Sequence, residues 1–152
     1  MKQRIRIAII VDLHRQTYDP GGAAQRQGYF ADIFLLRTVH RLNRFIRPDV
    51  TLVLGDLLDE PNAGRAARLL AGLRRILDLL ESPCIVLPGT HDPAPDVFYR
   101  TMPRPPEQMD VQGVRLLPFA DQQTEGYNAR RSAPDIARLA AARRDFNGPI
   151  VT

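Results

Sequence analysis

Three short runs of apolar, largely β-branched residues stand out along the amino-terminal part of the chain. They are Arg4–Val11, which alternates at first and then becomes continuously apolar, Val50–Leu54 and Cys84–Leu87. Continuous apolar runs of this length are typical of strands buried on both faces, as in parallel sheets. The pattern therefore predicts three strands of one sheet.

Between these runs, apolar positions recur at helical spacing. The pattern predicts a helix from Tyr29 to Ile46, which Arg47-Pro48 ends because the residue before a proline is disfavoured in the α conformation. A second amphipathic helix is predicted to begin near Asn62, a candidate N-cap, and to stop before Pro83. The alternation of strands and helices requires parallel strands joined by crossovers.

Beyond the third strand, prolines interrupt the pattern and shorter elements are expected. Val111–Phe119 predicts one or two edge strands, and Gly148–Thr152 is typical of the opening of another buried strand. Ser132 is expected to cap a helix over Pro134–Arg144. The residues expected on the inner face of that helix are Ile136, Leu139 and Ala140.

Polar motifs follow the three strands in succession. They are Asp12-Leu13-His14, Gly55-Asp56-Leu57-Leu58-Asp59 and Gly89-Thr90-His91-Asp92. Because the carboxyl ends of parallel strands share one edge of a sheet, we expect these carboxylates and imidazoles to converge. Such a ligand set suits a divalent metal such as Mn, Fe, Zn or Co. Each motif alone is typical of an ordinary turn, but three in a row favour a metal site.

In this order the motifs resemble the calcineurin-like metallophosphoesterase family, whose pattern runs Asp-x-His, Gly-Asp-x-x-Asp, Gly-Asn-His-Asp/Glu, a lone His and Gly-His-x-His. The resemblance implies an α/β fold, here a partial αββα metallophosphoesterase sandwich with a mostly parallel central sheet and flanking helices. It also implies two divalent metal ions as cofactors.

The resemblance assigns metal ligands by position in the motifs. Asp12 and His14 would ligate the first ion, and Asp56 would bridge both ions. Thr90 falls where the family's Asn ligates the second ion. A hydroxyl is a poorer metal ligand than an amide oxygen, so we expect the second site to be weak.

The resemblance also assigns residues that act on the substrate. His91 would stabilise or protonate the reacting phosphate, Asp92 would orient His91, and Asp59 would support the metal ligands. The implied reaction is hydrolysis of a phosphomonoester or phosphodiester bond in a phosphorylated substrate. Two alternatives stay open: a non-catalytic relative that serves binding or assembly, and a nucleic-acid-processing nuclease of the same family.

No histidine follows His91, so the chain matches only the amino-terminal half of the family pattern. We expect a single domain over residues 1–152 that lacks the carboxyl-terminal part of the fold. In complete form it would be an enzyme, whereas this chain alone would be inactive. An apolar sheet face left uncovered could support a homo-oligomer.

Charge and composition change this picture little. The net charge is +4, and the basic residues, of which only Lys2 is a lysine, fall in scattered clusters with the spacing of solvated helix faces. Charge therefore argues only weakly for nucleic acid as a partner. No apolar segment is long enough to cross a membrane, and the lone Cys84 suits a reducing compartment, so we expect a cytoplasmic protein. His40, inside the first helix, is predicted to be a surface residue and not a ligand.

Overall fold

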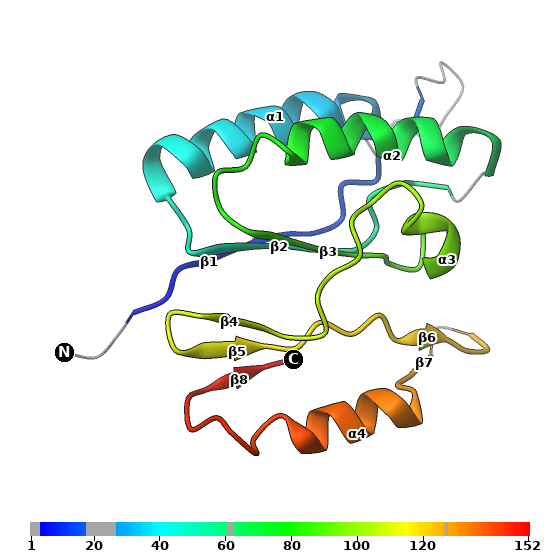
Figure 1. Cartoon of the computed structure of the whole chain (residues 1–152). Coiled ribbons are helices and arrows are strands. Elements are labelled where there is room, and N and C mark those ends of the chain that lie inside the picture. The colour runs from blue at the N-terminus through cyan, green and yellow to red at the C-terminus, as the bar shows by residue number, and fades with distance from the viewer. Residues whose placement is uncertain (1–3, 18–26, 61–62, 127) are drawn as a thin grey trace. The chain divides into compact units, whose positions relative to one another are not determined.

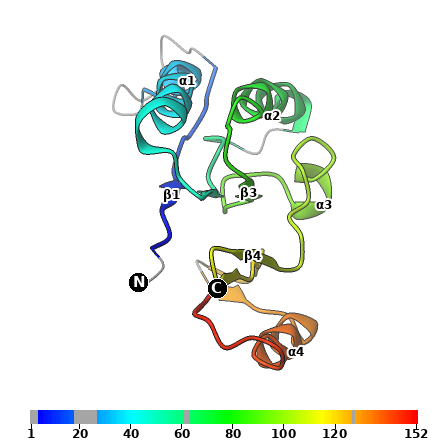
Figure 2. The same cartoon turned by 60° about the vertical axis from the view of Figure 1, so that its left-hand side comes forward.

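The computed structural model describes residues 4–17, 27–60, 63–126 and 128–152. These residues form two compact units. One spans Arg6–Arg104, and the other comprises residues 4 and 5 together with Pro105–Thr152. Each unit contains a three-stranded sheet, shown in two views in Figure 1 and Figure 2.

The sheet of the Arg6–Arg104 unit consists of β1 (Ile7–Ile10), β2 (Val50–Leu54) and β3 (Cys84–Leu87), in that order. Both pairings are parallel, and Leu52 lies opposite Ile9 on one side and Ile85 on the other. The predicted parallel sheet is confirmed. Its carboxyl ends, which carry the three polar motifs, therefore lie on one edge.

Two long helical segments cover one face of this sheet (Figure 1). The first consists of a 3-10 turn η1 (Gly28–Phe30), helix α1 (Ala31–Arg41) and a π-helical end η2 (Leu42–Ile46). It ends at Arg47, which has a left-handed φ of 49°. The second is α2 (Ala63–Leu77), whose expected start at Asn62 lies outside the described residues. Among the described residues, no helix combines the length and apolar character that a membrane crossing needs.

The core of this unit lies between the helices and the sheet. Leu35 of α1, Leu73 of α2 and Val53 of β2 are fully or almost fully buried there. Leu57 and Leu58, which separate Asp56 from Asp59, also have no exposed surface and anchor the loop after β2. The short helix α3 (Pro95–Phe98) adds Phe98 to the same core. On the strand residues that alternate with the core positions, apolar surface stays exposed, as at Ile9 and Leu54.

The Pro105–Thr152 unit is built on a hairpin. Strands β4 (Met109–Val111) and β5 (Val114–Leu116) pair antiparallel through Gln112-Gly113. Both turn residues have positive φ, 48° and 74°, as two-residue hairpin loops require. Strand β8 (Ile150–Val151) pairs parallel with β5, which confirms the predicted final strand. A second, smaller hairpin pairs β6 (Gln122–Gln123) with β7 (Ala129–Arg130), and no sequence pattern predicts it.

Helix α4 (Ala133–Ala141) begins at Ser132, whose Oγ accepts a hydrogen bond from the Asp135 N–H as predicted. The expected inner face of this helix is wrong, because Ile136, Leu139 and Ala140 are all exposed. Arg138 lies on the less exposed side instead. Its guanidinium pairs with Asp135 at 2.9 Å and stacks on the Phe119 ring. A guanidinium that is paired with a carboxylate and stacked on an aromatic ring can lie inward, so the helix is rotated away from its apolar stripe.

Candidate metal centre

The backbone joins the ends of β1 and β2 directly. The Asp12 N–H donates to the Gly55 carbonyl at 3.3 Å, and the His14 N–H donates to the Asp56 carbonyl at 2.9 Å. These bonds continue the parallel pairing beyond the strands. They bring together the first two polar motifs, as the sequence predicts.

The three residues expected to hold the first metal ion share an uncommon backbone conformation. Asp12, His14 and Asp56 have φ values of 55°, 44° and 51°, next to Gly55 at 82°. A residue with a side chain pays about 1–3 kcal/mol for such a conformation, and these outliers concentrate at functional sites. The fold therefore holds three strained residues at one place.

The side chains of these residues converge as well. One carboxylate oxygen of Asp12, one imidazole nitrogen of His14 and one carboxylate oxygen of Asp56 lie within 4.8 Å of one another. The Asp12 side chain is 65% exposed and that of His14 is 18% exposed, so the group is open to solvent on the Asp12 side. Mixed carboxylate and imidazole donors at this spacing fit one divalent cation.

The His14 ring lies between two carboxylates. Its Nε2 is 3.9 Å from Asp12 Oδ1, and its Nδ1 is 3.4 Å from Asp59 Oδ1. Although Asp59 is near, Nδ1 is buried and forms no hydrogen bond within the described part of the chain. Buried polar atoms normally have a partner. A bound cation that drew the ligands together would remove this mismatch, and carboxylates commonly orient a metal-binding imidazole from its far side.

The third motif contacts Asp56. The Asp56 Oδ1 atom accepts hydrogen bonds from the His91 N–H at 3.0 Å and from the Thr90 hydroxyl at 3.4 Å. Gly89 makes this approach possible, because a Cβ there would lie 2.2 Å from the same oxygen. Thr90, the expected ligand of a second ion, is exposed beside the bridging candidate.

His91 is held by the loop after β2. Its Nδ1 lies 2.8 Å from the Asp59 carbonyl oxygen, and its ring meets the His14 ring edge-on at a centroid distance of 4.9 Å. A carbonyl oxygen can only accept, so Nδ1 carries the hydrogen in this contact. The other ring nitrogen, Nε2, is then the atom through which a proton can be exchanged. His14, Asp59 and His91 also form a second group with metal-ligand spacing.

Asp92 joins the second and third motifs through its carboxylate. Oδ2 accepts from the N–H groups of Leu57 and Gly89 at 3.2 and 2.9 Å, and Oδ1 accepts from Leu58 at 3.0 Å. Burial raises the pKa of Asp92, while these three donors oppose the rise and the nearby Asp56 adds to it. Among the described residues, no hydrogen bond joins this carboxylate to the His91 ring. Its expected role toward His91 therefore stays a prediction, whereas its contact with the backbone is direct.

Two contributions to the site went unnoticed in the sequence. One is the Asp92 carboxylate, which accepts hydrogen bonds from the N–H groups of Leu57 and Leu58, 35 and 34 positions away in the sequence. The other is Gly28, where a Cβ would lie 1.9 Å from the His14 carbonyl oxygen. Neither has a sequence signal beyond its residue type. His40, by contrast, is exposed on α1, which confirms its predicted surface position.

Comparison with known proteins bears on these residues. The chain matches the family described as calcineurin-like phosphoesterase over residues 5–139, a range that contains all three polar motifs. A search of curated proteins finds no match.

Proposed function

Because the chain belongs to the calcineurin-like phosphoesterase family, a family of metal-dependent phosphoesterases, we propose that its metal centre serves hydrolysis of a phosphomonoester or phosphodiester bond. The observation that carries this proposal is the convergence of Asp12, His14 and Asp56 within 4.8 Å. All three belong to the Arg6–Arg104 unit.

The ligand chemistry supports a divalent ion such as Mn, Fe, Zn or Co at this group. Such an ion supplies Lewis acidity and stabilises charge that develops on phosphate oxygens. Asp12, His14 and Asp56 would hold it, and Asp59 would keep the His14 ring in place. We further propose a second, weaker ion beside Thr90, with Asp56 shared between the two.

His91 is the residue proposed to act on the phosphate. The hydrogen on Nδ1 is held by the Asp59 carbonyl, which fixes the ring and leaves Nε2 to face a substrate. In its protonated form the ring can donate from Nε2 to a phosphate oxygen or to the leaving oxygen. Asp59 thus supports the site twice, with its carboxylate near His14 and its carbonyl on His91.

Cytoplasmic localisation is part of the proposal. Burial raises the pKa of the Cys84 thiol to about 11, with Asp78 adding to the rise. The thiolate, which is the reactive form, is therefore scarce at neutral pH. A lone, unreactive thiol is consistent with a reducing compartment.

The test measures hydrolysis of an aryl phosphodiester by the protein at its natural full length, in the presence of Mn²⁺. We expect Asp56→Asn to abolish turnover, because it removes the negative charge and one of the two oxygens of a carboxylate that is proposed to serve both ions. Asp59→Ala should weaken turnover about 10–100-fold, as changes to residues that support metal ligands typically do. His91→Gln should slow turnover while bound Mn²⁺ stays unchanged.

The matched control is Asp96→Asn, which removes a carboxylate that is 72% exposed on α3. This variant should hydrolyse the substrate at the wild-type rate. Equal, mild effects of Asp56→Asn and Asp59→Ala would place the reaction elsewhere, and loss of Mn²⁺ from His91→Gln would make His91 a ligand.

A further inference from the structure

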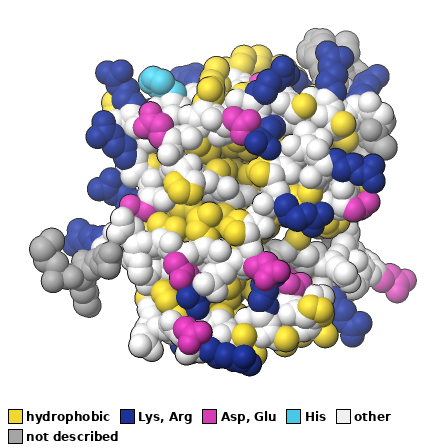
Figure 3. Space-filling view, viewed as in Figure 1, with side chains coloured by type: hydrophobic (Ala, Val, Ile, Leu, Met, Phe, Trp, Pro, Cys, Tyr) yellow, Lys and Arg dark blue, Asp and Glu magenta, His cyan; other side chains and the backbone are white. Residues whose placement is uncertain are grey.

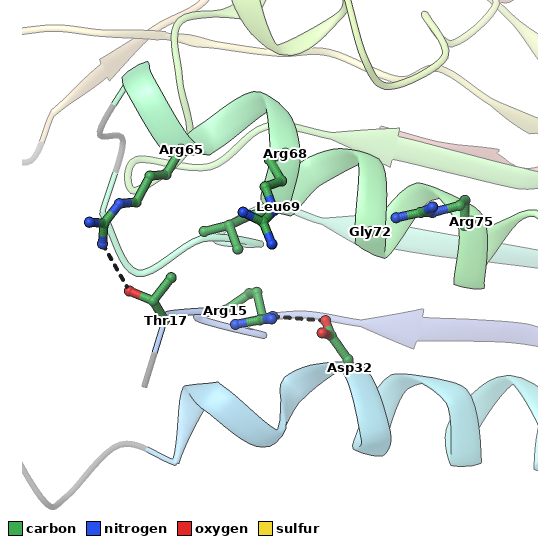
Figure 4. A pocket seen from close by; sticks show the side chains of 8 residues that line it. All are labelled: Arg15, Thr17, Asp32, Arg65, Arg68, Leu69, Gly72 and Arg75. Atoms are coloured by element: carbon green, nitrogen blue, oxygen red, sulfur yellow. Dashed lines mark hydrogen bonds and ion pairs between the residues drawn. The ribbon is translucent and has the colours of Figure 1, made fainter. Parts of the chain in front are cut away.

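A pocket of about 460 Å³ lies in the Arg6–Arg104 unit, next to helices α1 and α2. Its wall carries Arg15 from the segment after β1, Asp32 from α1, and Arg65, Arg68 and Arg75 from α2. Figure 4 shows these side chains around the space between the two helices. The volume falls within the range of about 300–1,000 Å³ common for small-molecule sites.

The pocket is strongly basic, with four guanidinium groups and a single carboxylate. Arg15 Nε pairs with Asp32 Oδ1 at 2.8 Å, and Arg65 donates to the Thr17 hydroxyl at 3.4 Å. The guanidinium groups of Arg68 and Arg75 form no hydrogen bond or ion pair with any described residue. Figure 3 shows basic side chains interspersed with acidic ones on the face that it presents. The positive charges of these two arginines are therefore available to pair with an anionic ligand.

The arginines of α2 form one stripe along the helix. Arg65, Arg68 and Arg75, with Gly72 between the last two, follow helical spacing and so lie on one side. A Cβ at Gly72 would meet no other atom within 4 Å, so the middle of the stripe is open space. Arg65 and Arg68 lie three positions apart, a spacing at which like charges on a helix repel each other, and a bound anion would offset this repulsion. The stripe therefore has both the charge and the room for a ligand.

We propose that this pocket binds a phosphate group, carried either by a small phosphorylated molecule or by a nucleic-acid backbone. A guanidinium group can donate two parallel hydrogen bonds to the oxygens of a phosphate. Asp32 is one carboxylate among four arginines, so it leaves most of these donors available for a phosphate. The site is distinct from the metal ligands, because it needs none of Asp12, His14 or Asp56.

The pocket is nevertheless connected to the metal centre by the chain. Arg15 directly follows His14, and its N–H donates to the Leu57 carbonyl at 2.8 Å, while its carbonyl accepts from the Asp59 N–H at 3.1 Å. A phosphate held by Arg15 therefore sits on the same backbone ladder that positions His14 and Asp59. Phosphate binding at the pocket is a separate property from the proposed hydrolysis and does not depend on it.

The test is titration of the metal-free protein, in EDTA, with pyrophosphate and separately with a short single-stranded DNA. We expect saturable binding of at least one probe. The double variant Arg68→Gln/Arg75→Gln should weaken it roughly tenfold or more, because it removes two positive charges that can each donate charge-assisted hydrogen bonds to phosphate oxygens. Both arginines are exposed and unpaired among the described residues, so folding should be unaffected. A second variant, Gly72→Glu, places a carboxylate in the open space and should also weaken binding.

The matched control is Arg37→Gln/Arg41→Gln, which removes the same charge from exposed positions of α1 outside the pocket. Binding should keep its wild-type affinity there. Pyrophosphate binding would identify a small phosphorylated ligand, and binding of DNA alone, weakening with salt, would identify a nucleic-acid backbone. The proposal is overturned if neither probe binds saturably, if the two double variants weaken binding equally, or if binding needs added Mn²⁺.

Discussion

Asp56 is the residue at which most contacts of the metal centre meet. Its carbonyl accepts from the His14 N–H, and its Oδ1 accepts from Thr90 and from the His91 N–H. Its left-handed φ of 51° is maintained by these bonds together with the buried leucines that follow it. The carboxylate is therefore fixed in place before any ion binds, which lowers the entropy that binding must overcome.

A substitution at Thr90 tests whether this residue limits the affinity for a second ion. Thr90→Asn replaces a hydroxyl by an amide oxygen, a better ligand for a divalent cation. We expect affinity for a second Mn²⁺ to rise by roughly tenfold or more, the scale typical of changes around metal sites. Calorimetric titration of the wild type and the variant measures it. Tight binding of two ions by the wild type would refute the expected weakness.

Residue types and their order were enough to locate Asp12, His14 and Asp56, because each directly follows a recognisable strand. They were not enough to assign Asp92. The family resemblance implies that Asp92 orients His91, which stays a prediction, and nothing in the sequence indicated that its carboxylate accepts hydrogen bonds from three backbone N–H groups. Which donors surround a buried carboxylate depends on how the loops after β2 and β3 pack, and this is set by tertiary structure.

At the scale of elements, the ends of β2 and β3 approach closely because two glycines face each other. A Cβ on Gly55 would lie 2.6 Å from the Gly89 Cα, and a Cβ on Gly89 would lie 2.3 Å from the Asp56 nitrogen. Gly55 also adopts a φ of 82°, which favours glycine. Gly55 therefore serves both the backbone conformation and the close approach, whereas Gly89 serves the close approach.

Gly89→Ala should separate these two strand ends. We expect it to destabilise the fold by about 1–3 kcal/mol, as overpacking does, and to weaken Mn²⁺ binding by displacing Asp56. Denaturant unfolding and Mn²⁺ titration measure the two effects. Gly72→Ala on α2 is the control: its Cβ meets open space, so it should instead stabilise the helix by about 0.5–1 kcal/mol. Equal responses of the two variants would contradict the proposed clash.

The Pro105–Thr152 unit depends on Arg115 of β5. Its guanidinium donates two hydrogen bonds to the Asp110 carboxylate, at 2.9 and 2.8 Å, and one to the Ala142 carbonyl at 2.8 Å. It also lies 4.2 Å from the centre of the Phe146 ring. One side chain thereby links β4, the end of α4 and the segment before β8.

This ion pair predicts a dependence of stability on pH. The hydrogen bonds and charge of Arg115 lower the pKa of Asp110 below the ordinary value of 3.8. A lowered native pKa means that the pair stabilises the fold above the ordinary value, and that this stabilisation is lost as pH falls through the lowered value. Asp110→Asn should unfold more easily at neutral pH and lose less stability on acidification, measured by denaturant unfolding across this range. A variant with the acid sensitivity of the wild type would contradict this.

Strong local patterns predicted elements well, and weak ones did not. Val50–Leu54 and Cys84–Leu87 are strands with the predicted bounds, because continuous apolar runs flanked by turn residues leave little choice. The inner face of α4 was misplaced, since Arg138 finds a carboxylate and an aromatic ring and lies inward. The hairpin of β6 and β7 consists of exposed residues, so no hydrophobic alternation marks it.

At the scale of the whole molecule, the metal centre and the basic pocket both lie in the Arg6–Arg104 unit. The convergence of the candidate metal ligands could be predicted because the polar motifs follow three strands of one sheet. The pocket could not, because Arg15 and the arginines of α2 are distant in sequence and each cluster alone is typical of a solvated surface. Only the packing of α1 and α2 beside the segment after β1 brings them together.

The central claim is that Asp12, His14 and Asp56 hold a divalent ion, and its most direct test is Mn²⁺ binding to residues 1–152, followed by electron paramagnetic resonance. The wild type should bind one ion per chain at its strong site. Asp12→Asn and Asp56→Asn should each weaken that binding by roughly a hundredfold, the upper end of the 10–100-fold range of supporting residues, while Asp96→Asn leaves it unchanged. Wild-type Mn²⁺ affinity in Asp56→Asn would contradict the account.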